Sequence, residues 1–199
     1  RSYELGADIS FFNNLVSINY TYSRQNVKDQ IFEVPLASST GSSSFMTNGG
    51  KIHTNAHELT VNINPIRLKN VDWNIGINWS KIDNYVDELA PGVESIFLGG
   101  FTTPQVRAGI GDKFPVIYGV SYARDDNGNL IVDEDGVPMA GKDDVIGKVS
   151  PDFILGFNTN LRLWKFNISA VFDWKQGGQI YCGTNGLLDM YGVSKNTEN

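Results

Sequence analysis

The sequence predicts an all-β fold of antiparallel strands, and three observations support this prediction. Apolar and polar residues alternate in several segments, which is the period of a strand with one apolar and one polar face. Glycine (21 of 199 residues), asparagine and aromatic residues are plentiful, a composition that favours strands joined by turns. Helical periodicity is missing, and no window of about 18 apolar residues exists, so no transmembrane helix is predicted.

Alternation is clear in six segments of the chain. In the last of them, for example, Phe166 and Ile168 alternate with Asn167, so that apolar and polar side chains point to opposite faces. The opposite faces carry mostly Asn, Ser, Gly and Thr, with few charges. The six predicted strands are Tyr3–Phe11, Leu15–Ser23, Glu58–Asn64, Asp72–Tyr85, Asp152–Leu163 and Lys165–Gly178.

The connections between these segments are short and long in turn. The short turns lie at residues 12–14, around Pro65 and Lys69, and at Trp164-Lys165. The long links are Arg24–His57 and Val86–Pro151. All short turns therefore fall at one end of the sheet and all long loops at the other, as in outer-membrane barrels. A compact soluble domain seldom contains a structureless loop as long as residues 86–151.

Aromatic residues lie toward both ends of the predicted strands, as in the two girdles of a membrane barrel. The path from Phe166 to Trp174, at roughly 3.3 Å per residue and a tilt of about 45°, spans on the order of 20 Å. This length is close to the apolar band of about 25 Å expected of such barrels. Phe166 and Phe172 are therefore expected to face lipid, and the polar faces suit a wet lumen or a plug.

These observations together predict an antiparallel up-and-down transmembrane β-barrel segment, about six strands of a large barrel with long extracellular loops. Residues 1–199 are interpreted as a partial barrel domain, with its C-terminal strand not included, because the chain starts with Arg1 rather than Met and its last residues do not resemble the end of a folded element. Since such a segment has two unpaired edges and an uncovered apolar face, it is not expected to fold as a soluble monomer.

The charged and metal-ligating residues argue against several other functions. The net charge of −6 argues against nucleic acid as a partner, and the acidic surplus between Asp125 and Asp144 is typical of a solvated loop. Cys182 is the single cysteine, so neither an internal disulfide nor a cysteine zinc cluster can form. His53 and His57 have a zinc-site spacing that works only on a helix, and they precede a strand.

The acidic run ARDDNGNLIVDEDGVPMAG has two interpretations. Asp125, Asn127 and Asn129 alternate as calcium ligands do, but Leu130 stands where an EF-hand loop needs glycine. A β-hairpin with turns at Asn127-Gly128 and Asp135-Gly136 fits the sequence better. No nucleophile-elbow motif is present, so the chain is not predicted to be an enzyme and no cofactor is expected.

Several stretches resemble the SusC/RagA family of TonB-dependent outer-membrane receptors of Bacteroidetes-type bacteria. The similarity runs from Arg1 to about Thr197 in register. It is carried by RSYELGADISFFNN, NGGKIHTNAHEL, WNIGINWSKIDNYVDEL and, most specifically, IGKVSPDFILGFNTNLRLWKFNISAVFDWKQGGQIY. In the second stretch Asn48, Gly50 and Glu58 fit the family pattern, whereas Thr54 and Ala56 depart from it.

The resemblance implies a role in a multi-pass barrel of the Gram-negative outer membrane. Members are large plugged barrels of the 22-stranded kind that import oligosaccharides or peptides too big for porins. It implies as partners a SusD-like surface lipoprotein over the mouth, outer-membrane lipid and TonB, which acts through a part of the receptor outside this chain. The plug domain is likewise not in this chain. The resemblance does not tell whether the substrate is a glycan or a peptide, nor what the oligomeric state is.

Ligand contact is predicted for residues in the long outer loop and on the lumen face. Aromatic side chains in outer loops often stack on sugars or bury peptide side chains, and polar lumen residues could hydrogen-bond a passing substrate. The alternative role of each is packing on the plug, on loops or on the lipoprotein. The candidates are Phe97, Phe101, Tyr118, Tyr122, Asn158, Asn160 and Arg162.

Two other functions remain compatible with the sequence. A passive porin-like channel would lack the plug and the TonB-binding segment, so sequence outside this chain decides that case. A soluble carbohydrate-binding β-sandwich would bury the apolar faces inside, and a shorter link than Val86–Pro151 would have favoured it.

Overall fold

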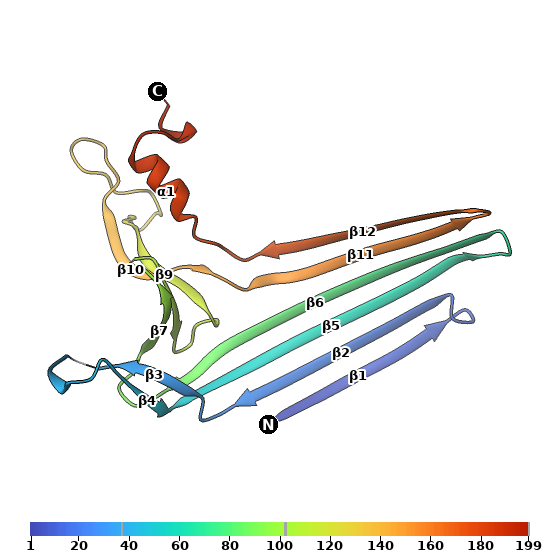
Figure 1. Ribbon diagram of the computed structural model, residues 1–199, viewed down its shortest axis with the longest axis horizontal. Coiled ribbons are helices and arrows are strands. Elements are labelled where there is room, and N and C mark those ends of the chain that lie inside the picture. Colours follow the sequence, from blue (N-terminus) through green and yellow to red (C-terminus); the bar gives the residue numbers. More distant parts are fainter. Residues whose placement is uncertain (37, 102, 199) are drawn as a thin grey trace.

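The computed structural model describes residues 1–36, 38–101 and 103–198, and it has two parts. A long, open antiparallel sheet forms the larger part, and shorter strands with a small helix gather at one of its ends (Figure 1). We call these two parts the wall and the outer group.

The wall is a six-stranded sheet with strand order β1-β2-β5-β6-β11-β12, so each strand pairs with the next one of the wall along the chain. This meander confirms all six predicted strands and their antiparallel order. The edges of the sheet are β1 and β12. The strands are β1 (Ser2–Phe11), β2 (Val16–Val27), β5 (Gly50–Arg67), β6 (Val71–Leu89), β11 (Pro151–Leu163) and β12 (Phe166–Gly177).

Three short turns close the wall at the end away from the outer group, as predicted (Figure 1). Phe12, Asn13 and Asn14 have left-handed backbones, with φ of 53°, 55° and 63°, which reverses the chain between β1 and β2. Asparagine tolerates this region better than most residues do. Trp164, at φ 54°, turns the chain between β11 and β12.

The strands β5 and β6 have 18 and 19 residues; β5 is much longer than the predicted Glu58–Asn64, whereas β6 extends the predicted Asp72–Tyr85 by only a few residues. Pro65 lies within β5, where the register against β6 shifts between Ile63 and Ile66. Such an irregularity accommodates a proline that cannot donate a ladder hydrogen bond. Since about 9–11 residues of a tilted strand cross a bilayer, the outer halves of β5 and β6 extend beyond that length.

The long links are not structureless, which corrects the prediction made for residues 86–151. The strand β3 (Ile31–Pro35) pairs with β4 (Ser44–Asn48), and the 3-10 turn η1 (Ser38–Thr40) lies between them. A second sheet has the order β10-β9-β8-β7. Its strands are β7 (Ser95–Gly100), β8 (Gln105–Gly109), β9 (Val116–Tyr122) and β10 (Ala140–Lys148).

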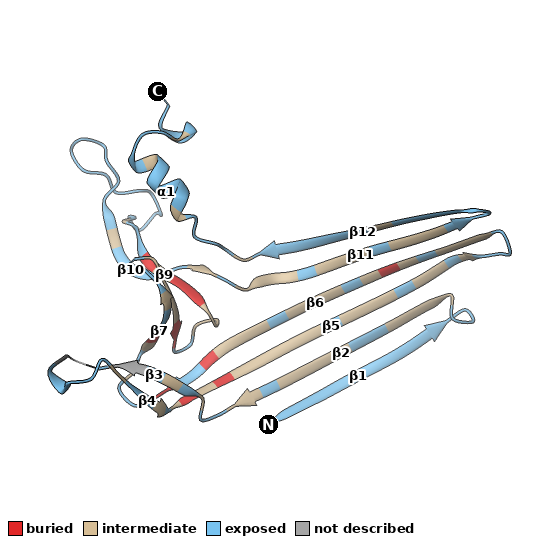
Figure 2. Ribbon diagram, viewed as in Figure 1, coloured by how far each residue is buried: buried red, intermediate tan, exposed pale blue. Residues whose placement is uncertain are grey.

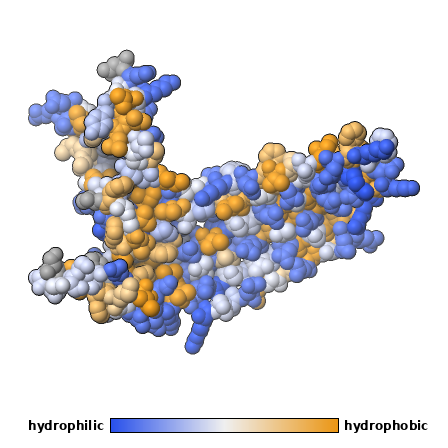
Figure 3. Space-filling model, in the orientation of Figure 1, coloured by the Kyte–Doolittle hydropathy of each residue, from blue (hydrophilic) through white to orange (hydrophobic). Residues whose placement is uncertain are grey.

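The hydrophobic core lies where this second sheet meets the wall. Val86 and Leu89 of β6 pack with Ile96 and Ala108 of the outer sheet. Buried residues concentrate there, whereas β1 and β12 are exposed along most of their length (Figure 2). On the face seen in Figure 3, apolar side chains also gather at this junction. The outer sheet therefore shares a hydrophobic core with the wall and is not connected to it by the chain alone.

A short helix, α1 (Gly183–Met190), and the 3-10 turn η2 (Lys195–Thr197) follow the wall. The sequence did not predict α1, because eight residues with two glycines are too few for a helical period to become visible. None of its residues is buried. Within the described residues, no helix is both long and apolar enough to cross a membrane.

Candidate functional site

The pairing register turns the predicted alternation into two continuous faces of the wall. One row across all six strands is apolar and consists of Ile9, Ile18, Val61, Ile77, Phe157 and Phe172. The adjacent row is Asp8, Asn19, Thr60, Asn78, Gly156 and Asp173. Because neighbouring rows point to opposite sides, the wall has an apolar face and a polar face.

Hydrogen bonds between strands order the polar face. Thr60 of β5 donates to Asn78 Oδ1 of β6 at 3.1 Å, and Asn19 of β2 donates to Asp8 of β1. Within β6, Asn74 Nδ2 donates to Asp72 Oδ1 at 2.7 Å. Hydroxyl and amide donors thus meet amide and carboxylate acceptors, which suits a surface in contact with water and polar solutes.

Asn158, Asn160 and Arg162 all lie on this polar face. Arg162 is 4.0 Å from Asp72 on the neighbouring strand, and Asn160 pairs in register with Asn74. A shallow hollow of about 290 Å³ includes Asn158 and is otherwise lined by Asn14, Ser17, Asn62, Ile63, Asn64, Arg67, Asn74, Ile75 and Gly76. The structure therefore brings one predicted residue, Asn158, into a polar hollow near the short turns.

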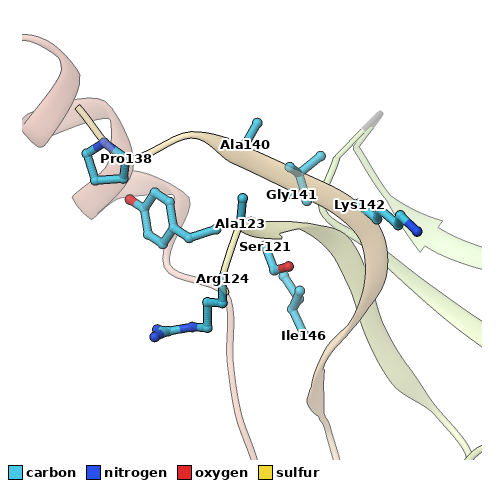
Figure 4. A pocket seen from close by; sticks show the side chains of 10 residues that line it. Ser121, Ala123, Arg124, Pro138, Ala140, Gly141, Lys142 and Ile146 are labelled. Carbon is cyan, nitrogen blue, oxygen red and sulfur yellow. The ribbon is translucent and has the colours of Figure 1, made fainter. Parts of the chain in front are cut away.

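Tyr122 lines a larger hollow of about 920 Å³ in the outer group. Two cations, Arg124 and Lys142, lie on different sides of it (Figure 4). Arg124 donates to the Gly128 carbonyl at 2.6 Å, so the hairpin fixes its side chain. The remaining lining residues are Val120, Ser121, Ala123, Pro138, Ala140, Gly141 and Ile146.

Phe101 lines a separate, mostly apolar hollow of about 310 Å³. It meets Ile117 of β9 there, together with Ile180 and Tyr181 from the segment after β12. The sequence did not single out Ile180 and Tyr181 as ligand residues, although both belong to the GGQIY stretch. Such a hollow suits an apolar group better than a sugar, whose hydroxyls need hydrogen-bond partners.

Tyr118 is largely engaged in internal contacts. The Arg107 guanidinium lies 4.6 Å above its ring, and the Tyr118 hydroxyl donates to the Asp143 carbonyl at 3.2 Å. Gln105 and Ser95 accept from Arg107 at 2.6 and 3.1 Å. The stack joins β8 to β9, so Tyr118 and the unpredicted Arg107 orient each other.

Phe97 has a side chain that is 48% exposed and pairs in register with Arg107. The aromatic candidates thus share one outer sheet and its loops, but they do not converge on a single site. The polar candidates Asn158, Asn160 and Arg162 lie on the wall.

The acidic hairpin has the two turns predicted for it. Gly128 donates to the Asp125 carbonyl at 2.9 Å, and Gly136 donates to the Asp133 carbonyl at 3.0 Å. Asp125 Oδ1 accepts from the backbone N–H groups of Asn127 and Asn129 at 2.9 and 2.8 Å. The Asn129 side-chain amide, and then these backbone donors, hold the pKa of Asp125 below its ordinary value.

The two histidines lie on the apolar face of the wall, at its outer end. His53 Nδ1 is 2.6 Å from Asp87 Oδ1, and His57 Nδ1 is 2.8 Å from the Tyr20 hydroxyl. Among the described residues, no group of three or more His, Cys, Asp or Glu side chains is placed to hold a metal ion. Cys182 is a free, exposed thiol.

Comparisons with known proteins agree on one class. No family model matches the chain. It is 26% identical to TonB-dependent receptor P3 and 28% identical to TonB-dependent receptor P26, both of Formosa agariphila, over 90% and 91% of this chain. The chain spans about a fifth (20%) of the length of these curated relatives.

Solved structures of an importer share the fold. The chain superposes on the RagAB peptide transporter with a TM-score of 0.71 at 19% identity, covering 88% of this chain and 21% of that one. It also superposes on the RagAB peptide importer in the closed-closed state, with a TM-score of 0.70. That second superposition covers 89% of this chain.

Proposed function

We propose that this chain is a wall segment of an outer-membrane nutrient importer. Its relatives confirm the predicted resemblance to TonB-dependent receptors of the SusC/RagA type. The apolar face of β12, including Phe166 and Phe172, meets lipid. The polar face, including Asn158, borders the lumen or the plug.

The position of the outer core carries this proposal. Val86 continues the even-numbered series of β6 that contains Asn74, Asn78 and Asn84, so it points to the polar side of the wall. Because Val86 packs with Ile96 and Ala108, the outer sheet is attached to that side. If the full receptor closes into a barrel, β7–β10 would lie over its mouth rather than over the surrounding lipid.

The outer hollows then lie near the path of the substrate. The apolar hollow of Phe101 suits the side chain of a peptide, and the hollow of Tyr122 is lined by an aromatic ring and two cations. The family resemblance leaves two substrate classes open, oligosaccharides and peptides, and the similar solved structures are of a peptide importer. Substrate held at the mouth would pass along the Asn-rich face once the plug is displaced.

Two partners follow from the proposal. A SusD-like surface lipoprotein would cover the mouth and contact the outer group, where exposed apolar side chains such as Ile180 (92% exposed) are available. TonB would act through a part of the receptor outside this segment.

Site-directed labelling of β12 tests the orientation of the wall. Single cysteines at Ser169 and Ala170, in the full-length receptor with Cys182→Ser, lie on opposite faces of one strand. We expect a membrane-restricted reagent to label the Ala170→Cys variant, and a water-restricted reagent to label Ser169→Cys or find it covered. Water access at Ala170→Cys, or a receptor absent from the membrane fraction, would favour a soluble sandwich.

A further inference from the structure

The apolar face of the wall ends abruptly at its outer end, and the change occurs within two rows of the sheet. One row joins Tyr20, Leu59 and Trp79. The next row toward the outside joins Tyr22, His57 and Lys81, and the row beyond it joins Arg24, Asn55 and Asp83. The face thus passes from large apolar and aromatic residues, through a mixed row of rings and a lysine, to polar and charged residues.

The aromatic rings at this boundary are linked to one another. The Tyr20 hydroxyl is 2.8 Å from His57 Nδ1, and the rings of Tyr22 and His57 are 4.9 Å apart. The Tyr22 hydroxyl also donates to Asn55 at 3.2 Å. Rings with an apolar body and a polar tip collect where hydrocarbon gives way to headgroups. This boundary therefore corresponds to the level of the headgroups.

A lysine from the outer group completes the charged rows. Lys113 belongs to the link between β8 and β9, which pairs with β6 through a bridge to Tyr85. Its ammonium group is 2.5 Å from Asp83 Oδ1 and 5.7 Å from the centre of the Tyr85 ring. Lys81 is 3.4 Å from the other oxygen of Asp83. One carboxylate is therefore shared by two lysines.

The exposed part of this cluster is cationic. The side chains of Lys81 and Lys113 are 43% and 29% exposed, whereas Asp83 is 17% exposed beneath them. The hydrogen bond that Lys113 donates to Asp83 raises the pKa of this lysine, so it stays charged at neutral pH. The other acids nearby are already engaged, because Asp87 contacts His53 and Asp152 pairs with Lys148.

We propose that Arg24, Lys81 and Lys113, together with the rings of Tyr22, His57 and Tyr85, form a headgroup site on the lipid side of the wall for a phosphorylated glycolipid of the outer leaflet. Lysine and arginine attract phosphate, and the aromatic rings suit the faces of sugars. The site is continuous with the apolar rows below it, which would contact the acyl chains. This inference rests on the proposed barrel orientation.

Lipid retention by the purified full-length receptor tests the proposal. The receptor would be placed in neutral phosphatidylcholine nanodiscs with bisphosphorylated lipid A, and bound lipid A would be counted by native mass spectrometry. We expect Lys81→Gln/Lys113→Gln to weaken lipid A binding about fivefold for each lysine removed. A matched control, Lys69→Gln/Lys165→Gln, removes two lysines from the short turns and should leave binding unchanged.

A third variant separates headgroup binding from a purely structural ion pair. Asp83→Asn removes the carboxylate between the lysines, so it should strengthen lipid A binding, whereas loss of a structural pair would not. Lipid A with its phosphates removed should bind all variants equally weakly. Inorganic phosphate at millimolar concentration should compete poorly, because it lacks the sugar and acyl contacts; full competition would identify a simple anion site and overturn the lipid assignment.

A test of barrel integrity distinguishes failure of the headgroup site from failure of the proposed barrel orientation. In one outcome, the variant without Lys81 and Lys113 stays in the membrane, shows heat-modifiable mobility in gels and still binds lipid A as the unchanged receptor does. That result would overturn the headgroup site alone. Water access at Ala170→Cys in the labelling experiment overturns the barrel orientation and the headgroup site together.

Discussion

The indole N–H of Trp73 donates to the hydroxyl oxygen of Thr159 at 2.9 Å, on the face of the wall that we assign to lipid. Thr159 pairs in register with Ile75 and Ala170, and its hydroxyl lies 3.3 Å from the Asn74 carbonyl. Hydrocarbon offers no hydrogen-bond partners, so the two polar groups satisfy each other.

Replacing Thr159 by valine leaves the Trp73 N–H without a partner in lipid. We expect Thr159→Val to lower the free energy of unfolding of the receptor by about 1–3 kcal/mol. Thr159→Ser keeps the hydroxyl and should cost less. Denaturant unfolding in lipid vesicles, followed by tryptophan fluorescence, measures both, and equal stability of the valine and serine variants would show that the bond contributes nothing.

A second prediction concerns the close approach of Gly49 to Ala90 at the base of the outer group. A Cβ on Gly49 would lie 2.7 Å from Ala90 Cβ and 2.9 Å from its Cα, so backbone must move to admit it. We expect Gly49→Ala to open the outer group and speed its proteolysis. Gly99→Ala is the control, because nothing lies within 4 Å of the added methyl there. Identical digestion of the two variants would contradict the prediction.

A third prediction follows from the lowered pKa of Asp125. Since the folded carboxyl binds its proton less readily than the unfolded one, its contribution to turn stability is fully present above the ordinary pKa of 3.8 and disappears as pH falls through the lowered value. Asn129→Ala removes the largest cause and should raise the pKa of Asp125 toward 3.8.

Carboxyl-carbon NMR of specifically labelled receptor in micelles would report this titration. Asn127→Ala provides the control, because Asn127 contributes only a backbone donor that the substitution keeps. An Asp125 titration that Asn129→Ala leaves unchanged would mean that the side-chain amide does not hold the carboxylate.

A fourth prediction concerns substrate contact in the outer hollows. If the importer takes peptides, Phe101→Ala should weaken binding of apolar peptides by about 1–3 kcal/mol, because one large apolar contact is lost. Phe12→Ala removes a similarly exposed ring at the short turns and should leave the affinity for apolar peptides unchanged (Phe12 is 76% and Phe101 70% exposed). Calorimetry with the receptor–lipoprotein complex measures both variants. Unchanged binding after Phe101→Ala, or loss after Phe12→Ala, would place the site elsewhere.

The wall could be predicted from the sequence because its two sides meet different surroundings. In β12, apolar residues such as Phe166, Ile168 and Phe172 alternate with a mostly polar series, and this period of two can be seen without knowing the partner strand. The outer half of β5 could not be recognised in this way. Around Thr54, Asn55 and His57 both faces are polar or mixed, so the alternation disappears although the strand continues.

The outer sheet escaped prediction for a different reason. Its strands are short, and their pairing shifts register, for example between Ala140 and Asp143 and between Val145 and Gly147. The register decides which side chains share a hollow, and it could not be read from the sequence. Phe101, Tyr118 and Tyr122 were therefore predicted only to lie in one loop, and the contact between Tyr118 and Arg107 was not foreseen. Lys113 joins the wall through pairing with Tyr85, which local patterns do not reveal.

The strands β5 and β6 continue from the short turns to the core beneath the outer sheet. This long paired ladder is a rigid support for β7–β10 at its outer end. Bending such a paired ladder would rupture many backbone hydrogen bonds at once. If the chain acts as we propose, the outer sheet would be a fixed part of the rim, and any widening of the entrance during transport would come from the displacement of other parts around it.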